Sequence, residues 1–356
     1  MRTGGTIVVR AKIVVEQWLG ARRYLNEHRY ELTLAARALY PHDLRVAGTP
    51  LLARPEWLPD EPVALDQVAL TLREEAGDGV PESSNAGPAT LSYAEVMAEL
   101  NRPALFENRV CYRLLDVTGK HLMFGVGRYF DLINTCEAVA HEFVAATLRG
   151  EHGSLALREQ IGDPTDLTRR RALAAITTLV LTRGDHTHGD GGPRMILHWR
   201  DPAKVATGGG LYTTAPVGMF QPSHDAVWNL RNDFSLWRSL VRELNEELLH
   251  ATEDYGSDEA PIDYQRWPLY RELTEAARTV RWLGLGVDPL SLVIDLLVVA
   301  VFDRPLGGEG INDEGRLVSV GFTEQNIERL ITTEHVQPAS AALLRLAWQH
   351  RDTLLR

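Results

Sequence analysis

Eight residues at positions 242–249, Arg-Glu-Leu-Asn-Glu-Glu-Leu-Leu, constrain the fold of this 356-residue chain more than any other segment. The three glutamates of the segment have the spacing i, i+3 and i+4, so a helix would place all three carboxylates on one face: Glu243, Glu246 and Glu247. Leucines at the same kind of spacing form the opposite stripe: Leu240, Leu244 and Leu248. A fold that contains this helix must bury the leucine stripe and leave room for three like charges.

The carboxylate face is a candidate cation site. Like charges at this spacing repel each other by roughly 0.2–0.5 kcal/mol per pair on an isolated helix. A divalent cation would remove that repulsion, and the hard ions Mg²⁺ and Mn²⁺ prefer carboxylate oxygen. The alternative is an ordinary acidic helix face in water. Arg242, four residues before Glu246, could pair with it. Spacing alone leaves both interpretations open.

Arg-Glu-Leu-x-Glu-Glu resembles the second half of the Nudix box, whose family pattern is Gly-x5-Glu-x7-Arg-Glu-U-x-Glu-Glu-x-Gly-U, with U aliphatic. In that family the helix glutamates bind Mg²⁺ or Mn²⁺, and the substrate is a nucleoside diphosphate linked to another group. The resemblance implies that Glu246 and Glu247 are the main metal ligands. It implies that Glu243 completes the ligand set or acts as the catalytic base, and that Arg242 orients the carboxylates.

The first half of the box is less complete. A predicted strand at 210–217 leads into Gly218, which resembles the glycine entry to the box. Counting on from Gly218, the acidic position of the family falls at His224. The distance from His224 to Arg242 is longer than the family pattern, which indicates an insertion at roughly 225–232.

Three further positions bear on catalysis. Asp233 stands near the expected distance before the box arginine and could replace the missing acid, whereas Gln221 and Leu249 occupy positions where the family often has an acid and a glycine. These departures support a second hypothesis, a catalytically degenerate Nudix-fold module that senses a nucleotide or mediates protein contacts. A loop histidine whose hydrogen bonds are satisfied within the protein is the alternative reading of His224. The predicted substrate-binding residues are Gly218, His224 and Arg200.

The order of predicted elements supports the same fold. It is similar to a Nudix domain, which implies an α+β fold, an α/β/α sandwich with a mixed sheet flanked by helices. A turn-rich loop at 184–192 joins the first two strands in a hairpin. The resemblance covers about residues 165–356. Its predicted elements are strands at 172–183, 193–200, 210–217 and 290–303 and helices at 236–250, 322–331 (N-cap Thr323) and about 338–355.

Length favours two domains. Residues 1–155 form the first, an α+β region that matches no family we recognise, with a flexible loop at about 74–90 that is rich in Gly, Ser, Pro and acid. Ser92 and Glu95 form a capping box, and Thr118-Gly119 marks a hairpin turn. The predicted elements of this region are strands at 6–15, 108–117 and 120–124 and helices at 16–40, 65–73 and 134–148.

Composition limits the partners. A net charge of −11 argues against sequence-independent nucleic-acid binding, although a bound metal can bridge acidic residues to a nucleotide ligand. Cys111 and Cys136 indicate neither a disulfide framework nor a zinc site. The longest apolar run, 290–302, contains Asp295 and is too short to span a membrane. We expect a cytoplasmic protein without a membrane partner; a homo-oligomer stays open.

Two other clusters contain metal-competent side chains. Asp185-His-Thr-His188-Gly-Asp190 lies in a glycine-rich stretch, where a turn between strands is the more ordinary interpretation. His141-Glu142 begins like the His-Glu-x-x-His motif of zinc proteases, but the second histidine position is Ala145. A pair of residues on the surface of a helix is the better interpretation there.

Overall fold

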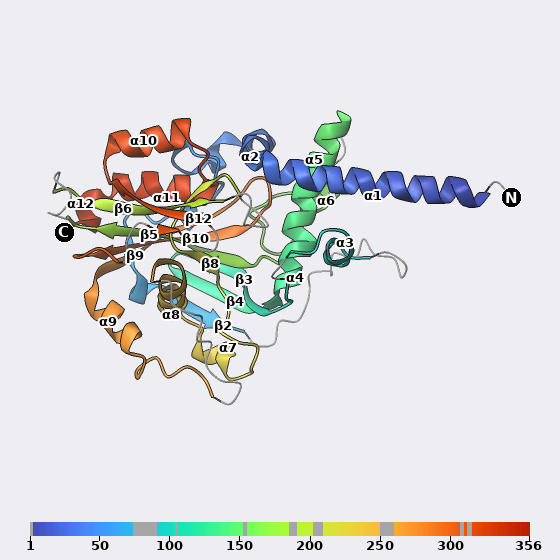
Figure 1. The fold of residues 1–356 in the computed structure, drawn as a ribbon. Coiled ribbons are helices and arrows are strands. Elements are labelled where there is room, and N and C mark those ends of the chain that lie inside the picture. The colour runs from blue at the N-terminus through green and yellow to red at the C-terminus, as the bar shows by residue number, and fades with distance from the viewer. Residues whose placement is uncertain are drawn as a thin grey trace.

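The computed structural model describes residues 3–73, 91–103, 106–151, 155–184, 191–201, 209–249, 260–306, 310–311 and 315–356, with the backbone alone for 3–11. The predicted loop at 74–90 and the Asp185–Asp190 cluster lie outside these residues. Within them, helices lie on both sides of a mixed sheet (Figure 1). The predicted α+β fold with a sheet between helices is therefore confirmed.

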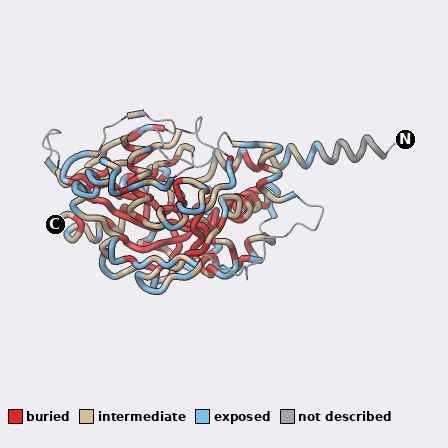
Figure 2. The backbone as a smooth tube through the Cα atoms, turned by 90° about the horizontal axis from the view of Figure 1, so that it is seen from below, coloured by how far each residue is buried: buried red, intermediate tan, exposed pale blue. Residues whose placement is uncertain are grey.

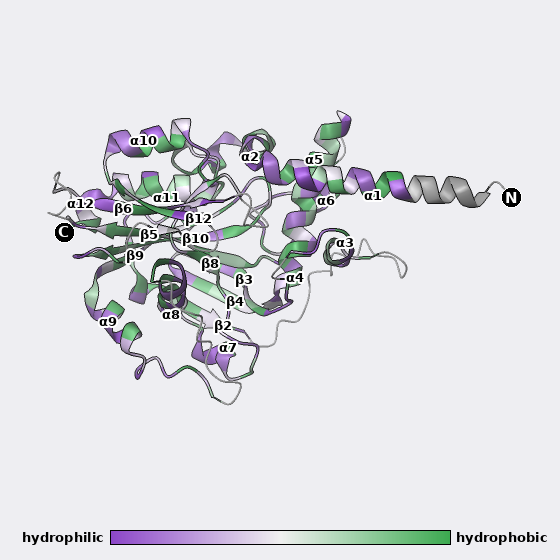
Figure 3. Ribbon diagram, in the orientation of Figure 1, coloured by the Kyte–Doolittle hydropathy of each residue, from purple (hydrophilic) through white to green (hydrophobic). Residues whose placement is uncertain are grey.

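Two long strands, β5 (Ala174–Thr182) and β10 (Ile294–Phe302), run parallel in the middle of the sheet. Every residue of both strands is buried, which accounts for their nearly continuous apolar sequences. β9 (Ala277–Val287) lies antiparallel to β10, and β1 (Val63–Ala64) pairs with the outer edge of β9. Figure 2 shows these buried segments inside the molecule, and Figure 3 shows their hydrophobic residues.

One edge of β5 is shared by two strands that diverge. Residues Ala175–Thr177 pair with β8 (Val217–Met219), whereas Leu181 and Thr182 pair with β6 (Arg194–Arg200), as the predicted hairpin requires. The strand predicted at 210–217 is in fact two short strands, because β7 (Tyr212–Thr214) pairs with β6 and only β8 pairs with β5. The sheet continues beyond β6 through β12 (Gly315–Gly321) and β11 (Gly310–Ile311).

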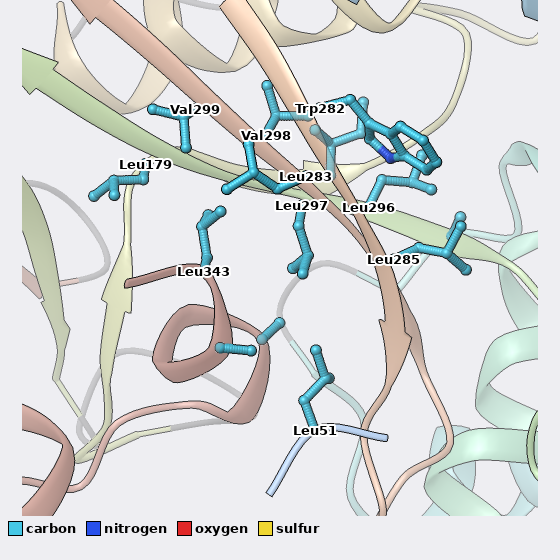
Figure 4. Packing of buried hydrophobic residues seen from close by; sticks show 14 of the residues in the cluster. Leu51, Leu179, Trp282, Leu283, Leu285, Leu296, Leu297, Val298, Val299 and Leu343 are labelled. Carbon is cyan, nitrogen blue, oxygen red and sulfur yellow. The ribbon is translucent and has the colours of Figure 1, made fainter. Parts of the chain in front are cut away.

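Helices cover both faces of this sheet (Figure 1). One layer contains α10 (Glu324–Thr333), α11 (Pro338–Gln349) and α12 (Arg351–Leu354). The predicted N-cap Thr323 is confirmed, because its side chain accepts a hydrogen bond from the backbone N–H of Asn326. Figure 4 shows Leu343 of α11 facing Leu297 of β10 within the core. The other layer contains α7 (Asn229–Asn232), α8 (Leu236–Glu243) and α9 (Pro268–Ala276).

The predicted hairpin of the first region is present, with β3 (Val110–Thr118) antiparallel to β4 (His121–Arg128). The sequence predicts a helix at 65–73, which is wrong, because β2 (Ala69–Leu72) pairs in parallel with β4. A strand of four residues is too short to show a clear periodic pattern, and its partner strand lies more than forty residues away in the sequence. This small sheet joins the main one through hydrogen bonds from Tyr112 N to Phe220 O (3.0 Å) and from Leu114 N to Ala172 O (2.8 Å).

The strand predicted at 6–15 is also wrong, because α1 runs from Thr3 to Glu27 as one helix. Ala21 and Leu25 of α1 are buried in a cluster with residues of α5 (Ala138–Arg149). Each residue added to a helix that this packing already holds gains a backbone hydrogen bond within the helix. A strand would instead need a second strand to pair with. The predicted Ser92–Glu95 capping box is confirmed at the start of α3. The other helices here are α2 (Arg29–Arg37), α3 (Tyr93–Leu100), α4 (Tyr129–Leu132), the π-helical Ile133–Glu137 and α6 (Ala156–Ile161).

The two predicted regions share one hydrophobic core. Leu52 and Val287 of β9 exchange two backbone hydrogen bonds (3.0 and 2.7 Å). Gly284, whose φ is +116°, and Gly286 let the segment 51–58 lie directly on β9, because a Cβ at either glycine would come within 3.0 Å of it. The boundary between 155 and 165 stays a prediction, but residues on both sides of it pack in the same cluster (Figure 4).

Candidate functional site

The predicted acidic helix is present. Ser235 caps α8 by accepting a hydrogen bond from Arg238 N, and the helix continues beyond Glu243 as a π-helical turn, Leu244–Leu248. The predicted leucine stripe is buried as expected, at Leu240, Leu244 and Leu248. A π turn holds one more residue in each hydrogen-bonded loop than an α turn, and such turns occur frequently at functional sites.

Glu243 lies directly over Gly218 of β8. A Cβ added at position 218 would come closer than 3.0 Å to all three atoms of the Glu243 carboxyl group. Gly218 pairs with Ile176 of β5, so this position is fixed by the sheet. The sequence predicts Gly218 as a substrate-binding residue; the structure gives it a second role, which is to leave the space that the carboxylate fills.

Glu247 lies at the point where β6 and β8 diverge. Its Oε1 accepts a hydrogen bond from Val217 N at 3.0 Å, and its Oε2 is 3.9 Å from Nδ1 of His198 on β6. Both side chains are largely shielded, with relative exposures of 15% for Glu247 and 2% for His198. Sequence reasoning missed His198. Strand alternation puts it on the same face of β6 as the predicted substrate residue Arg200, and that signal could have found it.

Glu246 differs from the other two glutamates because it is exposed. The structure therefore brings Glu243 and Glu247 against β8 and leaves Glu246 on the solvent side. In the part of the chain that the structure describes, no group of three or more His, Cys, Asp and Glu side chains is arranged to hold a metal. The carboxylates of Glu243 and Glu247, both set against β8, provide oxygen ligands of the kind that a hard divalent cation prefers. The three-glutamate ligand set stays a prediction.

Arg242 is directed toward the preceding loop. It donates hydrogen bonds to Gln221 O (2.7 Å), Ser239 Oγ (3.1 Å) and Tyr264 OH (2.6 Å). Its Nη1 is also 4.0 Å from Oδ1 of Asp233. The pairing expected with Glu246 is replaced by these contacts, so Arg242 ties the acidic helix to the loop that precedes it. Any effect of Arg242 on the carboxylates acts through the position of the helix.

Asp233, the expected replacement acid, is fully buried. Its carboxylate accepts hydrogen bonds from four donors: Ser223 N (2.7 Å), Ser223 Oγ (2.6 Å), Asn232 Nδ2 (2.9 Å) and Tyr264 OH (2.9 Å). Burial raises the pKa of Tyr264, so its hydroxyl stays protonated as a donor. A carboxylate enclosed in this way anchors the loop and is not available to a solvent-borne ligand.

The insertion at 225–232 is held by the first region of the chain. Asp225 accepts a hydrogen bond from Val110 N (2.8 Å) and pairs with Arg128 (3.0 Å). Tyr112 OH donates to Leu230 O at 3.0 Å. His224, predicted at the acidic position of the box, accepts a hydrogen bond through Nδ1 from Ala226 N at 3.2 Å, a contact within its own turn. That contact matches the alternative reading of His224.

The prediction that His141-Glu142 lies on a helix surface is wrong for His141, which is buried in the packing of α5 against α1. His141 packs edge-on against Trp18, and burial lowers its pKa to about 4. Glu142 accepts hydrogen bonds from Leu157 N (2.8 Å) and Arg158 N (3.2 Å) at the start of α6.

No described helix is long and apolar enough to cross a membrane.

Comparison with known proteins finds no relative of this chain. No protein-family model matches the chain, and no curated protein is significantly similar to it. The resemblance to the Nudix family therefore rests on the sequence motif alone.

Proposed function

We propose that the chain is a Nudix-like, metal-dependent phosphohydrolase that acts on a nucleoside diphosphate derivative. One observation carries the proposal. Val217-Gly218 and Glu243–Glu247 resemble the two halves of one motif, and they meet in the fold, with Glu243 over Gly218 and Glu247 on Val217 N. An acidic helix face that is merely solvated would not need these contacts with Val217 and Gly218.

In this proposal Glu243 and Glu247, with Glu246 from the solvent side, hold Mg²⁺ or Mn²⁺. Such an ion, when bound, neutralises diphosphate charge and lowers the pKa of an attacking water. The residues of the chain position the carboxylates: Val217 N–H fixes one oxygen of Glu247, and His198 lies beside the other. Glu243 accepts the proton of the water. Arg200, on the same face of β6 as His198, meets the anionic substrate.

The test compares turnover of a panel of nucleoside diphosphate derivatives with Mg²⁺ or Mn²⁺. We expect Glu243→Gln to lower kcat by roughly 10²–10⁴-fold with a smaller change in KM, the loss typical of a positioned acid or base. Glu324→Gln is the matched control, because Glu324 is exposed on α10 across the sheet. Titration calorimetry with Mn²⁺ should lose its signal when Glu246 and Glu247 are both changed to Gln. Hydrolysis that survives substitution of all three glutamates would disprove the proposal.

A second candidate is a nucleotide-sensing or protein-interaction module with the same fold. The observations that favour it are the acidic position taken by His224, whose Nδ1 bonds within its own turn, and the enclosure of Asp233. A sensor would turn over no member of the panel, yet one nucleoside diphosphate derivative would raise its melting temperature through binding to the folded state. Slow hydrolysis with full metal dependence would favour the enzyme.

We also propose that this activity is cytoplasmic and involves a small nucleotide rather than nucleic acid. Both cysteines are free and buried, which is compatible with a reducing compartment. The acidic composition opposes contact with a polyphosphate backbone.

A further inference from the structure

A cleft of about 580 Å³ lies beside the start of α8. Its walls are the segment 64–70, the residues Phe234–Trp237 at the helix start, and the first residues of β9, into which α9 leads directly (Figure 1). The described lining includes neither Glu243 nor Glu247, so the cleft is distinct from the candidate site. Its volume falls within the range of about 300–1,000 Å³ that is usual for small-molecule sites.

Two arginines of β9, Arg278 and Arg281, line the cleft. Three residues apart, they would point to opposite faces of a regular strand. The pairing of β9 with β10 shifts by one residue here, since Thr279 pairs with Val301 but Ala277 pairs with Phe302. Arg278 is the extra residue of this bulge, and a bulge re-aims its side chain. The bulge thus accounts for the presence of both arginines in the lining of one cleft.

These guanidinium groups lack counterions. Among the described residues, no carboxylate lies within 4.0 Å of Arg278 or Arg281, and Nε of Arg281 is buried with no hydrogen-bond partner. The described lining holds one acid, Asp66, against the two arginines. Two arginines without a carboxylate partner among the described residues leave positive charge at the cleft for an anionic ligand. Guanidinium groups bind carboxylate and phosphate with particular strength.

The opposite wall is aromatic and apolar. Phe234 and Trp237 line it, together with Leu65 and Leu70. The indole of Trp237 is fixed in place by a hydrogen bond from Nε1 to Thr274 Oγ1 at 2.9 Å. The cleft therefore offers cationic donors on one side and a preformed apolar surface on the other.

We propose that this cleft binds a small amphipathic anion. Its carboxylate or phosphate head meets Arg281 and Arg278, and its flat apolar body lies against Phe234 and Trp237. This site is independent of the phosphohydrolase proposal, because it uses other residues and requires no metal.

The test uses the fluorescent dye 8-anilinonaphthalene-1-sulfonate, which has an anionic head and an aromatic body. We expect saturable binding of one dye per chain, weakened roughly tenfold or more by Arg281→Gln because a charge-assisted contact is lost, and weakened less by Arg278→Gln, whose side chain is exposed. Arg316→Gln, which removes an exposed charge from β12, should leave the dye affinity unchanged. Denaturant unfolding of each variant separates a lost contact from a lost fold.

The probe's two parts can be tested separately. The neutral N-phenyl-1-naphthylamine, which lacks the sulfonate, should bind much more weakly and with the same affinity in wild type and Arg281→Gln. Displacement of the dye by phenyl phosphate or by phenylacetate supports the site, and the stronger competitor identifies the head group. Dye affinity that is unchanged by Arg281→Gln in a folded variant, or displacement by neither competitor, would overturn the proposal.

Discussion

Two regions of the molecule satisfy carboxylates that are shielded from solvent in different ways. Between α1 and the π-helical turn before α5, Glu137 is buried and pairs with the guanidinium groups of Arg22 and Arg29. Burial alone would raise the pKa of Glu137, but the two arginines and their hydrogen bonds lower it to about 2. On the acidic helix, Glu247 contacts a backbone N–H and an imidazole instead.

The comparison sets a structural acid against two acids that we propose as metal ligands. The two arginines carry more positive charge than the single negative charge of Glu137. Its carboxylate therefore has no charge left to bind a further cation. Glu243 and Glu247 are positioned instead by the space over Gly218 and by the backbone N–H of Val217. The predictions below test whether this contrast holds.

The largest expected effect is at the structural acid. Glu137→Gln leaves two arginines without their counterion, at least one of them fully buried, and breaking a buried pair in this way typically costs about 3–5 kcal/mol. Denaturant unfolding measures the loss. Glu16→Gln is the control, because the Lys12–Glu16 pair is largely exposed and should contribute little. Equal stability of the Glu137 variant and wild type would remove the basis of the comparison.

The next effect is at Glu243, a proposed metal ligand. Gly218→Ala should displace the Glu243 carboxylate, lowering the free energy of unfolding by about 1–3 kcal/mol, as overpacking does, and weakening Mn²⁺ binding in calorimetry. Gly20→Ala is matched to it, because a Cβ at Gly20 of α1 meets nothing within 4 Å. That control should be neutral or slightly stabilising. Unchanged metal binding in Gly218→Ala would show that Glu243 is not a ligand.

Asp295 of β10 is a third shielded carboxyl group, and it pairs with no arginine among the described residues. Burial raises its pKa to about 7, although Thr177 Oγ1 donates to it at 2.7 Å. The protonated form is the one that suits the core. Its contribution to stability is complete below the ordinary aspartate pKa and is lost as the pH rises through about 7.

The free energy of unfolding should therefore fall by about 1.4 kcal/mol per pH unit between pH 4 and 7 from this group. Asp295→Asn should remove that slope, whereas Asp60→Asn, an exposed control, should keep it. The measurement is urea unfolding across this pH range. Parallel curves for wild type and Asp295→Asn would contradict the assignment.

The smallest effect concerns Asp233, a structural acid held by neutral donors. Tyr264→Phe removes one of its donors and one partner of Arg242, so it should cost about 0.5–1.5 kcal/mol. Tyr270→Phe is the comparison, because its ring packs on Tyr264 at 5.2 Å and its hydroxyl makes no hydrogen bond within the described residues. A larger loss for Tyr270 than for Tyr264 would mean that packing, not hydrogen bonding, fixes the loop.

Local signals explain what could be predicted from the sequence. The acidic helix, the caps at Ser92 and Thr323, and the buried strand β5 are each encoded within a short window, and each is found in the structure. β9 cannot be recognised from such a short window, because it begins with Ala-Arg-Thr-Val-Arg and its later half contains two glycines. Those glycines are explained by a segment more than two hundred residues earlier, which no local pattern reveals.

The candidate site shows the same limit. The three glutamates could be found from spacing, and Gly218 from its resemblance to the box. His198 could have been found from its alternation with Arg200 on β6, whereas Tyr264 could not, because its position depends on how the loop folds over Asp233. The sequence identified which residue types carry the chemistry; only the fold showed which of the glutamates meet and which one faces solvent.

The contact between β9 and the segment 51–58 has a consequence for how the chain is made. Gly284 and Gly286 complete the seat for Leu51 and Trp57, but they are synthesised more than two hundred residues later. At about 5–20 residues per second, the earlier segment waits on the order of 10–50 s for its partner strand. During translation its leucines and tryptophan are exposed to chaperones or to neighbouring chains, so this protein should depend on ribosome-associated chaperones more than a chain of similar size with local contacts.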